Sequence, residues 1–195
     1  SLHDALPIWE YWKQDLDSLD EYLKEERYKV DLFDVPLHYN MYQASEHGRD
    51  YDLTKILDGT LVQNHPTLAV TFVDNHDEDR IASKLNNLAN LFPVYQLLFT
   101  LPGIPSVYYG SEWAIKGIKG GSDDWSLRPN ISPINHNSDY NYNLENVIKR
   151  FINIRHQTPA LKHGIYKQLL IKQKQFAFER KLGEETVIVT INISD

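Results

Sequence analysis

The side chains best suited to chemistry follow an apolar stretch of the sequence. The segment VTFVD, residues 70–74, leads directly into Asn75, His76 and Asp77. A carboxylate at the exit of a buried strand can stabilise a developing positive charge or take part in proton transfer, and a neighbouring histidine can donate a hydrogen bond to a hydroxyl group. A helix cap, an Asx turn or a solvated loop explains an isolated run of this kind equally well.

A metal site is a further interpretation of the same run, with Asp74, His76 and Asp77 as ligands. No His-Glu-x-x-His pattern and no second histidine–carboxylate cluster completes such a site in the sequence. The chain has no cysteine, which excludes disulfides and thiolate ligands. We therefore predict no metal ligands and no cofactor within the chain.

Apolar runs alternate with helical patterns along most of the sequence, which predicts an α/β fold. The expected strand exits at Glu10, Asp34, Asp74 and Tyr109 are 24, 40 and 35 residues apart. These spacings bracket the roughly 30 residues per unit of a barrel with eight strand–helix units. A doubly wound sheet gives the same alternation, but no glycine-rich phosphate loop follows any strand here.

The pattern changes near the C-terminal end of the sequence. After Gly164 the hydrophobic period becomes two, in the runs IYKQLLI, QFAFERK and TVIVTINI. We expect residues 1–160 to form part of a TIM barrel and residues 161–195 to begin a small antiparallel β domain.

Charge and hydropathy exclude two classes of partner. The chain has 20 lysines and arginines against 27 aspartates and glutamates, a net charge of −7. This balance argues against binding to nucleic acid, which requires a basic face. No run of about 18 apolar residues is present, so we expect no membrane span. The composition leaves the cellular compartment open.

Four motifs resemble the alpha-amylase family, glycoside hydrolase family 13, and they occur in the family's order. FVDNHD (72–77) resembles its last catalytic motif, and GIPSVYYGSEW (103–113) is similar to its eighth barrel strand. EYW (10–12) resembles the motif that holds the general acid after the fifth strand, and LFDVPLHYNMYQAS (32–45) is similar to the sixth. The resemblance implies strands five to eight of a (β/α)8 barrel, followed by the start of the family's C-terminal β domain.

The same resemblance implies roles for three residues. Glu10 would be the acid/base, Asp77 the stabiliser of the transition state, and His76 a ligand for sugar hydroxyls. Glu10 lies between Trp9 and Trp12, and apolar neighbours can raise the pKa of a carboxyl group until it can protonate a leaving oxygen. A glutamate on the surface near the start of the chain is the alternative.

Three more residues are candidates for substrate binding. Tyr11 and Trp12 can stack on sugars in a cleft, or they can equally pack in the core. Arg80 is the third candidate, although we expect it to pair with Asp77 or Glu78 rather than to touch substrate.

The implied function is that of a retaining glycoside hydrolase that cleaves α-1,4-glucosidic bonds in starch or maltodextrins, with an α-glucan or maltooligosaccharide as its partner. A transglycosylase of the same family and a non-catalytic carbohydrate- or partner-binding relative are the alternatives. Up to Asp77 the chain resembles liquefying amylases, whereas the following segment resembles the maltodextrin-processing branch, so the size of the substrate stays open.

Two of the family's motifs are not found in the chain. These are the Arg-x-Asp motif of the nucleophile and the Asp-x-x-x-Asn-His motif of the third strand, and both belong upstream of residue 1. Asp31 and Asp34 have no arginine two residues before them. We therefore expect this segment alone to be inactive, and we expect calcium only as a possible ligand of a longer protein.

Overall fold

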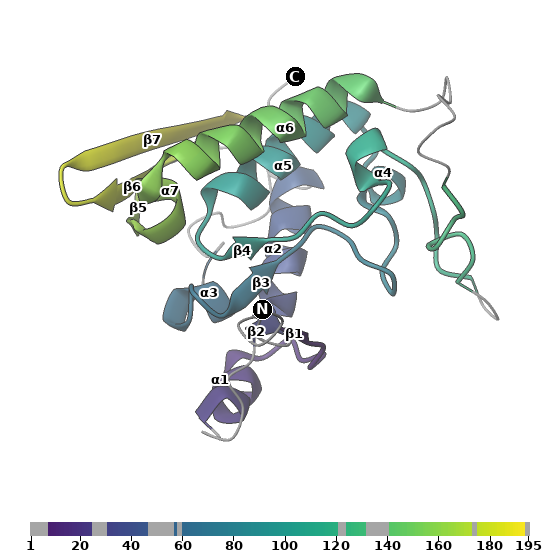
Figure 1. Cartoon of the computed structure of the whole chain (residues 1–195), viewed down its shortest axis with the longest axis horizontal. Coiled ribbons are helices and arrows are strands. Elements are labelled where there is room, and N and C mark those ends of the chain that lie inside the picture. Colours follow the sequence, from purple (N-terminus) through teal and green to yellow (C-terminus); the bar gives the residue numbers. More distant parts are fainter. Residues whose placement is uncertain are drawn as a thin grey trace, which may run out of the picture.

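The computed structural model describes residues 8–24, 31–46, 57, 60–120, 124–131, 141–172 and 175–193. A parallel sheet of four strands lies at its centre, in the order in which the strands occur in the sequence (Figure 1). The strands are β1 (Ile8–Trp9), β2 (Asp31–Phe33), β3 (Ala69–Thr71) and β4 (Ile104–Pro105). This sequential order agrees with part of a barrel, because a doubly wound sheet reverses its order at a switch point.

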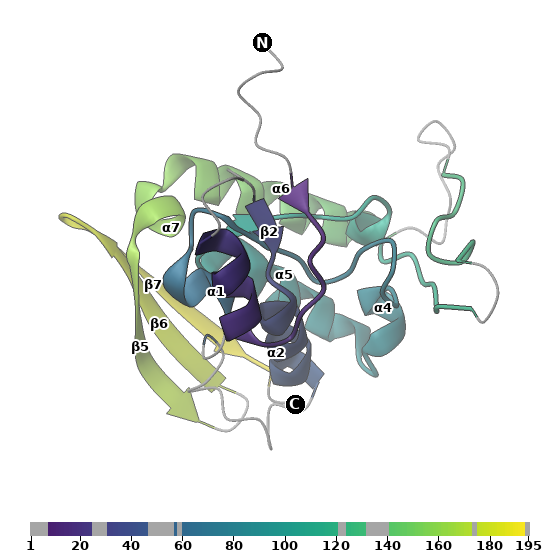
Figure 2. The ribbon, with the colours of Figure 1, turned by 90° about the horizontal axis from the view of Figure 1, so that it is seen from below.

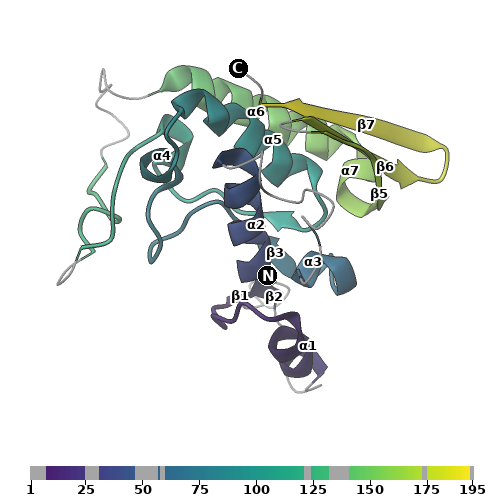
Figure 3. The same ribbon diagram turned by 180° about the vertical axis from the view of Figure 1, so that it is seen from behind.

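Helices connect and cover these strands. They are α1 (Leu16–Lys24), α2 (Val35–Glu46), α3 (Leu61–Asn64), α4 (Ile81–Lys84), α5 (Leu91–Thr100), α6 (Tyr142–Gln157) and α7 (Pro159–His163), with short 3-10 turns at Leu88–Asn90 and Ser111–Trp113. In Figure 3, α2 and α5 lie on the same side of the parallel sheet. No described helix is long and apolar enough to cross a membrane.

Two helices begin at side chains that cap them. Asp15 accepts a hydrogen bond from the Ser18 backbone N–H at 2.9 Å, which satisfies a free donor in the first turn of α1. Asn141 does the same for α6, at 3.0 Å from the Leu144 nitrogen. Proline at position 159 follows the end of α6, as expected for a residue that cannot continue a helix.

The core forms where the parallel sheet meets α5. The three residues of β3 are all at most 2% exposed, which matches a strand covered on both faces. Helix α5 is almost entirely buried, including Leu97, Leu98 and Phe99. Helix α2 ends at Glu46, and most of residues 47–59 lie outside the described part of the chain.

An antiparallel sheet follows α7, in the order β5 (Ile165–Lys172), β6 (Gln175–Leu182) and β7 (Glu185–Asn192). The three predicted strands are confirmed. One face of this sheet joins the same hydrophobic cluster as α5, through Phe178 and Val189. Figure 2 shows the sheet on one side of the molecule and α4 on the opposite side.

Two buried arginines hold the C-terminal end of α5. Arg180 of β6 donates to the Thr100 carbonyl at 2.6 Å and to the Gly164 carbonyl at 2.9 Å. Arg155 of α6 donates to the carbonyls of Phe99 and Leu101, at 2.8 and 3.2 Å. The last carbonyls of a helix have no partner within the helix and carry partial negative charge, so these cations satisfy and neutralise them. Burial lowers the pKa of each guanidinium to about 10.

Asp34, directly after β2, joins two helices. One of its carboxylate oxygens accepts from the Leu37 N–H of α2 at 3.1 Å, and the other accepts from the Val62 N–H of α3 at 2.8 Å. The side chain is completely buried. Burial raises its pKa from 3.8 to about 6 and outweighs the backbone hydrogen bonds from Val62, Leu37 and Leu61, which act in the opposite direction.

Replacing Arg180 by glutamine should destabilise the chain by about 2–4 kcal/mol, because the shorter neutral side chain leaves buried carbonyls without a donor. Urea unfolding followed by circular dichroism measures the free energy of unfolding. Arg150→Gln on the exposed face of α6 is the matched control and should change that free energy by less than about 0.5 kcal/mol. Equal effects of the two variants would contradict the capping role of Arg180.

The raised pKa of Asp34 predicts a pH dependence of stability. Between pH 3.8 and about 6 the folded chain holds this proton more tightly than the unfolded chain does, so the free energy of unfolding falls as pH rises through this window. The shift corresponds to about 3 kcal/mol. We expect the difference in free energy of unfolding between the wild type and Asp34→Asn to shrink from pH 4 to pH 6.5. A difference that stays constant over this range would refute the assignment.

Candidate active site

Three side chains from two strand exits meet at one rim of the parallel sheet. Glu10 follows β1, and His76 and Asp77 lie in the turn after β3. The Nε2 atom of His76 is 3.5 Å from Oε1 of Glu10 and 3.4 Å from Oδ2 of Asp77. Parallel strands bring their carboxyl ends to the same rim, which explains how residues 66 positions apart come into contact.

A cavity of about 300 Å³ opens beside these groups, lined by Glu10, Trp12, Asp77, Glu78 and Lys119. Two of its carboxylates belong to the predicted catalytic residues. Such a polar cavity with an aromatic wall suits a ligand that carries both hydroxyl groups and apolar ring faces.

Basic residues from the segment after β4 hold the turn that carries His76 and Asp77. Arg128 donates to Oδ1 of Asp77 at 2.8 Å and to the His76 carbonyl at 3.3 Å. Lys119 donates to the Asp77 carbonyl at 3.1 Å. Within the turn, the Asp77 N–H donates to Oδ1 of Asn75 at 2.9 Å, which is an Asx turn. The Arg128–Asp77 pair is about half exposed, so its contribution to stability is small.

The structure corrects the interpretation of Arg80. Its side chain is completely buried and donates to the carbonyls of Tyr109 and Leu127, each at 2.6 Å. A guanidinium without exposed surface has nothing to offer a ligand in the cavity, so Arg80 is not a substrate-binding residue here. The predicted pairing of Arg80 with Asp77 or Glu78 is also wrong, since Asp77 pairs with Arg128.

The two aromatic candidates lie in different surroundings. Trp12 is 37% exposed and forms one wall of the cavity. Tyr11 stacks on Tyr22 of α1, with ring centroids 4.7 Å apart, and packs against the hydrophobic core. The geometry therefore favours a core role for Tyr11 and leaves Trp12 as the aromatic residue available to a ligand.

Lys119 and Arg128 belong to the site, although no motif in the sequence indicates them. They lie 42 and 51 residues after Asp77 and belong to a segment without helical or strand periodicity. Glu78 was noted only as a possible ion-pair partner, although it lines the cavity. The one feature of the sequence that points to Lys119 and Arg128 is their position after the last predicted parallel strand, where barrels carry functional loops.

Asp74, His76 and Asp77, the metal ligands considered as an alternative from the sequence, do not form one site. Asp74 is buried and accepts hydrogen bonds from the Ile81 N–H and the Ser111 hydroxyl, at 2.8 Å each. Instead, one ligand atom from each of Glu10, His76 and Asp77 lies within 4.8 Å of the others. These are oxygen and nitrogen donors of the kind that a divalent cation accepts, and exposed acidic groups of this kind are common without one.

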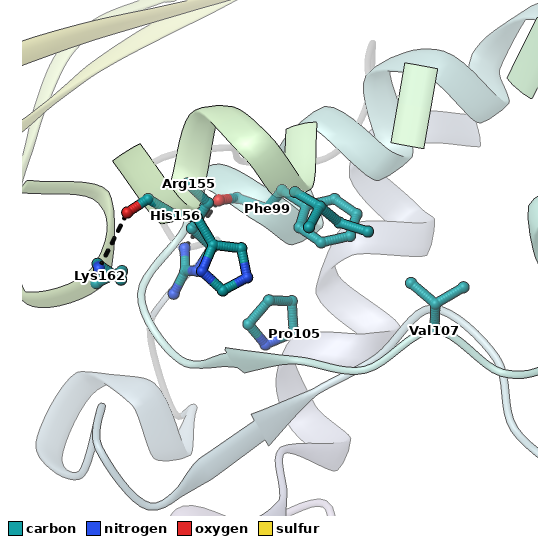
Figure 4. Close-up of a pocket in the computed structure, with 7 residues that line it drawn as sticks. Phe99, Pro105, Val107, Arg155, His156 and Lys162 are labelled. Atoms are coloured by element: carbon teal, nitrogen blue, oxygen red, sulfur yellow. Dashed lines mark hydrogen bonds between the residues drawn. The ribbon is translucent and has the colours of Figure 1, made fainter. Parts of the chain in front are cut away.

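A larger cavity of about 390 Å³ lies between α5, α6 and β4 (Figure 4). It is lined by Phe99, Pro105, Val107, Ile152, Arg155, His156 and Lys162, and it shares no lining residue with the cavity at Glu10. None of these side chains is a carboxylate, so this cavity offers no pair of carboxyl groups for glycoside hydrolysis. The smaller, polar cavity is the candidate active site.

Comparisons with known proteins identify the family of the chain. A family model described as "Alpha amylase, catalytic domain" matches residues 1–152. The glucan 1,4-alpha-maltohexaosidase of Bacillus sp. (strain 707) is 42% identical over 111 residues, which is 55% of the chain and 21% of that protein. A cyclomaltodextrin glucanotransferase of Niallia circulans is 29% identical over 143 residues, covering 73% of the chain and 19% of that protein. The chain thus spans about a fifth of the length of these relatives.

A solved structure shows the same arrangement of elements. The alpha-amylase of Geobacillus thermoleovorans, complexed with acarbose, superposes with a TM-score of 0.76 at 26% sequence identity. The match covers 95% of the chain and 41% of that protein.

Proposed function

The chain belongs to the alpha-amylase family, and from this premise we propose that it is the C-terminal half of the catalytic barrel of a retaining α-glucan hydrolase. Its substrate would be an α-1,4-linked glucan or maltooligosaccharide. The observation that carries the proposal is the meeting of Glu10, His76 and Asp77 at one rim, beside a cavity with a tryptophan wall.

Each of the three residues has a proposed step. The carboxyl group of Glu10 protonates the glycosidic oxygen as the bond to the anomeric carbon breaks, and the resulting carboxylate later takes a proton from the attacking water. The charge of Asp77 stabilises the oxocarbenium-like transition state. His76 lies between the two carboxylates and donates to a sugar hydroxyl. In this scheme the nucleophile comes from outside these 195 residues, because no Arg-x-Asp motif is present among them.

A transglycosylase is the second candidate. Its support is the similarity to a protein named cyclomaltodextrin glucanotransferase, which extends over 73% of the chain. Water and a sugar hydroxyl compete for the same glycosyl-enzyme intermediate, so both activities use the same groups at this rim. Product analysis on maltoheptaose separates them: shorter chains alone indicate hydrolysis, and longer or cyclic products indicate transfer.

We expect Asp77→Asn and Glu10→Gln to reduce turnover in the complete enzyme that carries this segment. Removing the charge of Asp77 should cost a factor of about 10² or more on every substrate. Glu10→Gln should cost as much on maltooligosaccharides but much less on activated aryl glycosides, whose leaving groups need little protonation. Steady-state kinetics on both substrates measures the two effects.

Glu179→Gln in β6 is the matched control, because it removes a carboxylate far from the rim. Loss of less than about tenfold in Asp77→Asn would count against the transition-state role. Equal losses of Glu10→Gln on both substrates would exclude acid catalysis by Glu10. A zinc or manganese ion bound through His76 in the purified protein would favour the metal interpretation instead.

Residues 1–195 alone should show no glycosidase activity. Retaining hydrolysis requires a nucleophile about 5–5.5 Å from the acid/base. No described residue close to Glu10 is proposed as this nucleophile. The assay uses soluble starch and a nitrophenyl maltooligosaccharide with monodisperse protein. Turnover above background would mean that the chain supplies its own nucleophile.

A further inference from the structure

A turn of five residues, 75–79, carries His76 and Asp77, and two buried charged residues flank it. Asp74 on one side is 2% exposed, and Arg80 on the other is completely buried. Buried charges are costly unless hydrogen bonds satisfy them, so their partners determine where the ends of the turn lie.

The hydroxyl group of Ser111 connects these two residues. It donates to the carboxylate of Asp74, with oxygen distances of 2.8 and 2.9 Å, and it accepts from Nη1 of Arg80 at 3.0 Å. Oδ2 of Asp74 also accepts from the Ile81 N–H at 2.8 Å. Arg80, Ser111 and Asp74 thus form one buried chain of hydrogen bonds that closes the turn at its base.

Arg80 also fixes this turn to the segment after β4. Its guanidinium donates to the carbonyls of Tyr109 and Leu127 and lies 4.2 Å from the centre of the Tyr108 ring. Its backbone N–H donates to the Gly117 carbonyl at 2.9 Å. The exits of β3 and β4 are therefore joined by a buried cation.

We propose that Ser111 and Arg80 are positioning residues, which form a buried polar tie with Asp74 and fix the orientation of His76 and Asp77 toward Glu10. The expected effect of these residues on ligand binding rests on the proposed function, whereas their effect on the position of the turn does not. Neither residue lines the cavity at Glu10. Both act through the turn.

The tie is needed because the other contacts of the turn are exposed. Asp77 is held by its own Asx turn and by Arg128, whose ion pair with Asp77 is about half exposed and open to screening. Hydrogen bonds in a buried network are stronger than such contacts, because the surroundings have a low dielectric constant. A displacement of about 1 Å at a catalytic group can cost a factor of about 10² in rate, so the base of the turn matters for function.

The test measures backbone hydrogen exchange by NMR and binding of maltoheptaose by calorimetry, in the full chain. In Ser111→Ala we expect the amides of Asp77 and Ile81 to exchange about tenfold faster, as the loss of a hydrogen bond to a charged group allows. The amides of β5, β6 and β7 should stay within about twofold. The dissociation constant for maltoheptaose should rise at least about fivefold.

Thr100→Val is the matched control, because it too deletes the hydroxyl group of a buried residue. The Thr100 hydroxyl donates to the Gln96 carbonyl and lies outside the tie. This variant should leave exchange at Asp77 and binding of maltoheptaose unchanged. Ser111→Cys, which keeps a weak donor, should lie between Ser111→Ala and the wild type. If Ser111→Ala does not fold, Arg80→Lys provides the same measurement, because lysine keeps the charge but cannot reach all three acceptors.

Unchanged exchange at Asp77 would overturn the proposal. So would faster exchange by one common factor at Asp77 and throughout β5–β7, because that pattern indicates a purely global loss of stability. If the wild type binds no maltoheptaose, the proposed function fails, while the exchange of Asp77 and Ile81 still decides whether the tie positions the turn.

Discussion

The parallel pairing of β1, β2 and β3 is the constraint on which the rest of the structure depends. Trp9 pairs with Leu32, and Leu32 pairs with Ala69, so the ends of the three strands lie within two residues of one another. This register places Glu10 and the turn after β3 within reach of each other. Because β3 is buried on both faces, a shift of register would expose apolar side chains, and packing therefore maintains the geometry of the site.

Three buried cations join the parallel sheet to its surroundings. Arg80, Arg155 and Arg180 donate mainly to backbone carbonyls in the described part of the chain. Carbonyl groups at helix ends and in turns lack a hydrogen-bond donor within their own element. A guanidinium group has five N–H donors and can satisfy several of these carbonyls at once. Arg155 and Arg180 thereby attach α6 and the antiparallel sheet to α5, and Arg80 attaches the active-site turn to the segment after β4.

Local patterns predicted what depends on local physics. The alternation of apolar runs with helical patterns gave the α/β order, the period of two gave β5 to β7, and the order of motifs gave the rim with Glu10 and Asp77. Arg80 was misjudged because its position next to two acidic residues in sequence says nothing about burial. Its true acceptors lie 29 and 47 residues away. Arg128 was missed for the same reason, because its contact with Asp77 depends on how an irregular segment returns to the rim.

The charges at the rim indicate which part of the proposed reaction this chain can supply. Glu10 and Asp77 are both close to His76, and Arg128 and Lys119 stand on the other side of Asp77. Such a set can transfer a proton and stabilise positive charge on a sugar ring, which are two of the three tasks in retaining hydrolysis. The third task, attack on the anomeric carbon, requires a carboxylate on the opposite side of the ring from the leaving group. None of the three carboxylates that line the cavity, Glu10, Asp77 and Glu78, is proposed for this task, which under the proposed function falls to another residue.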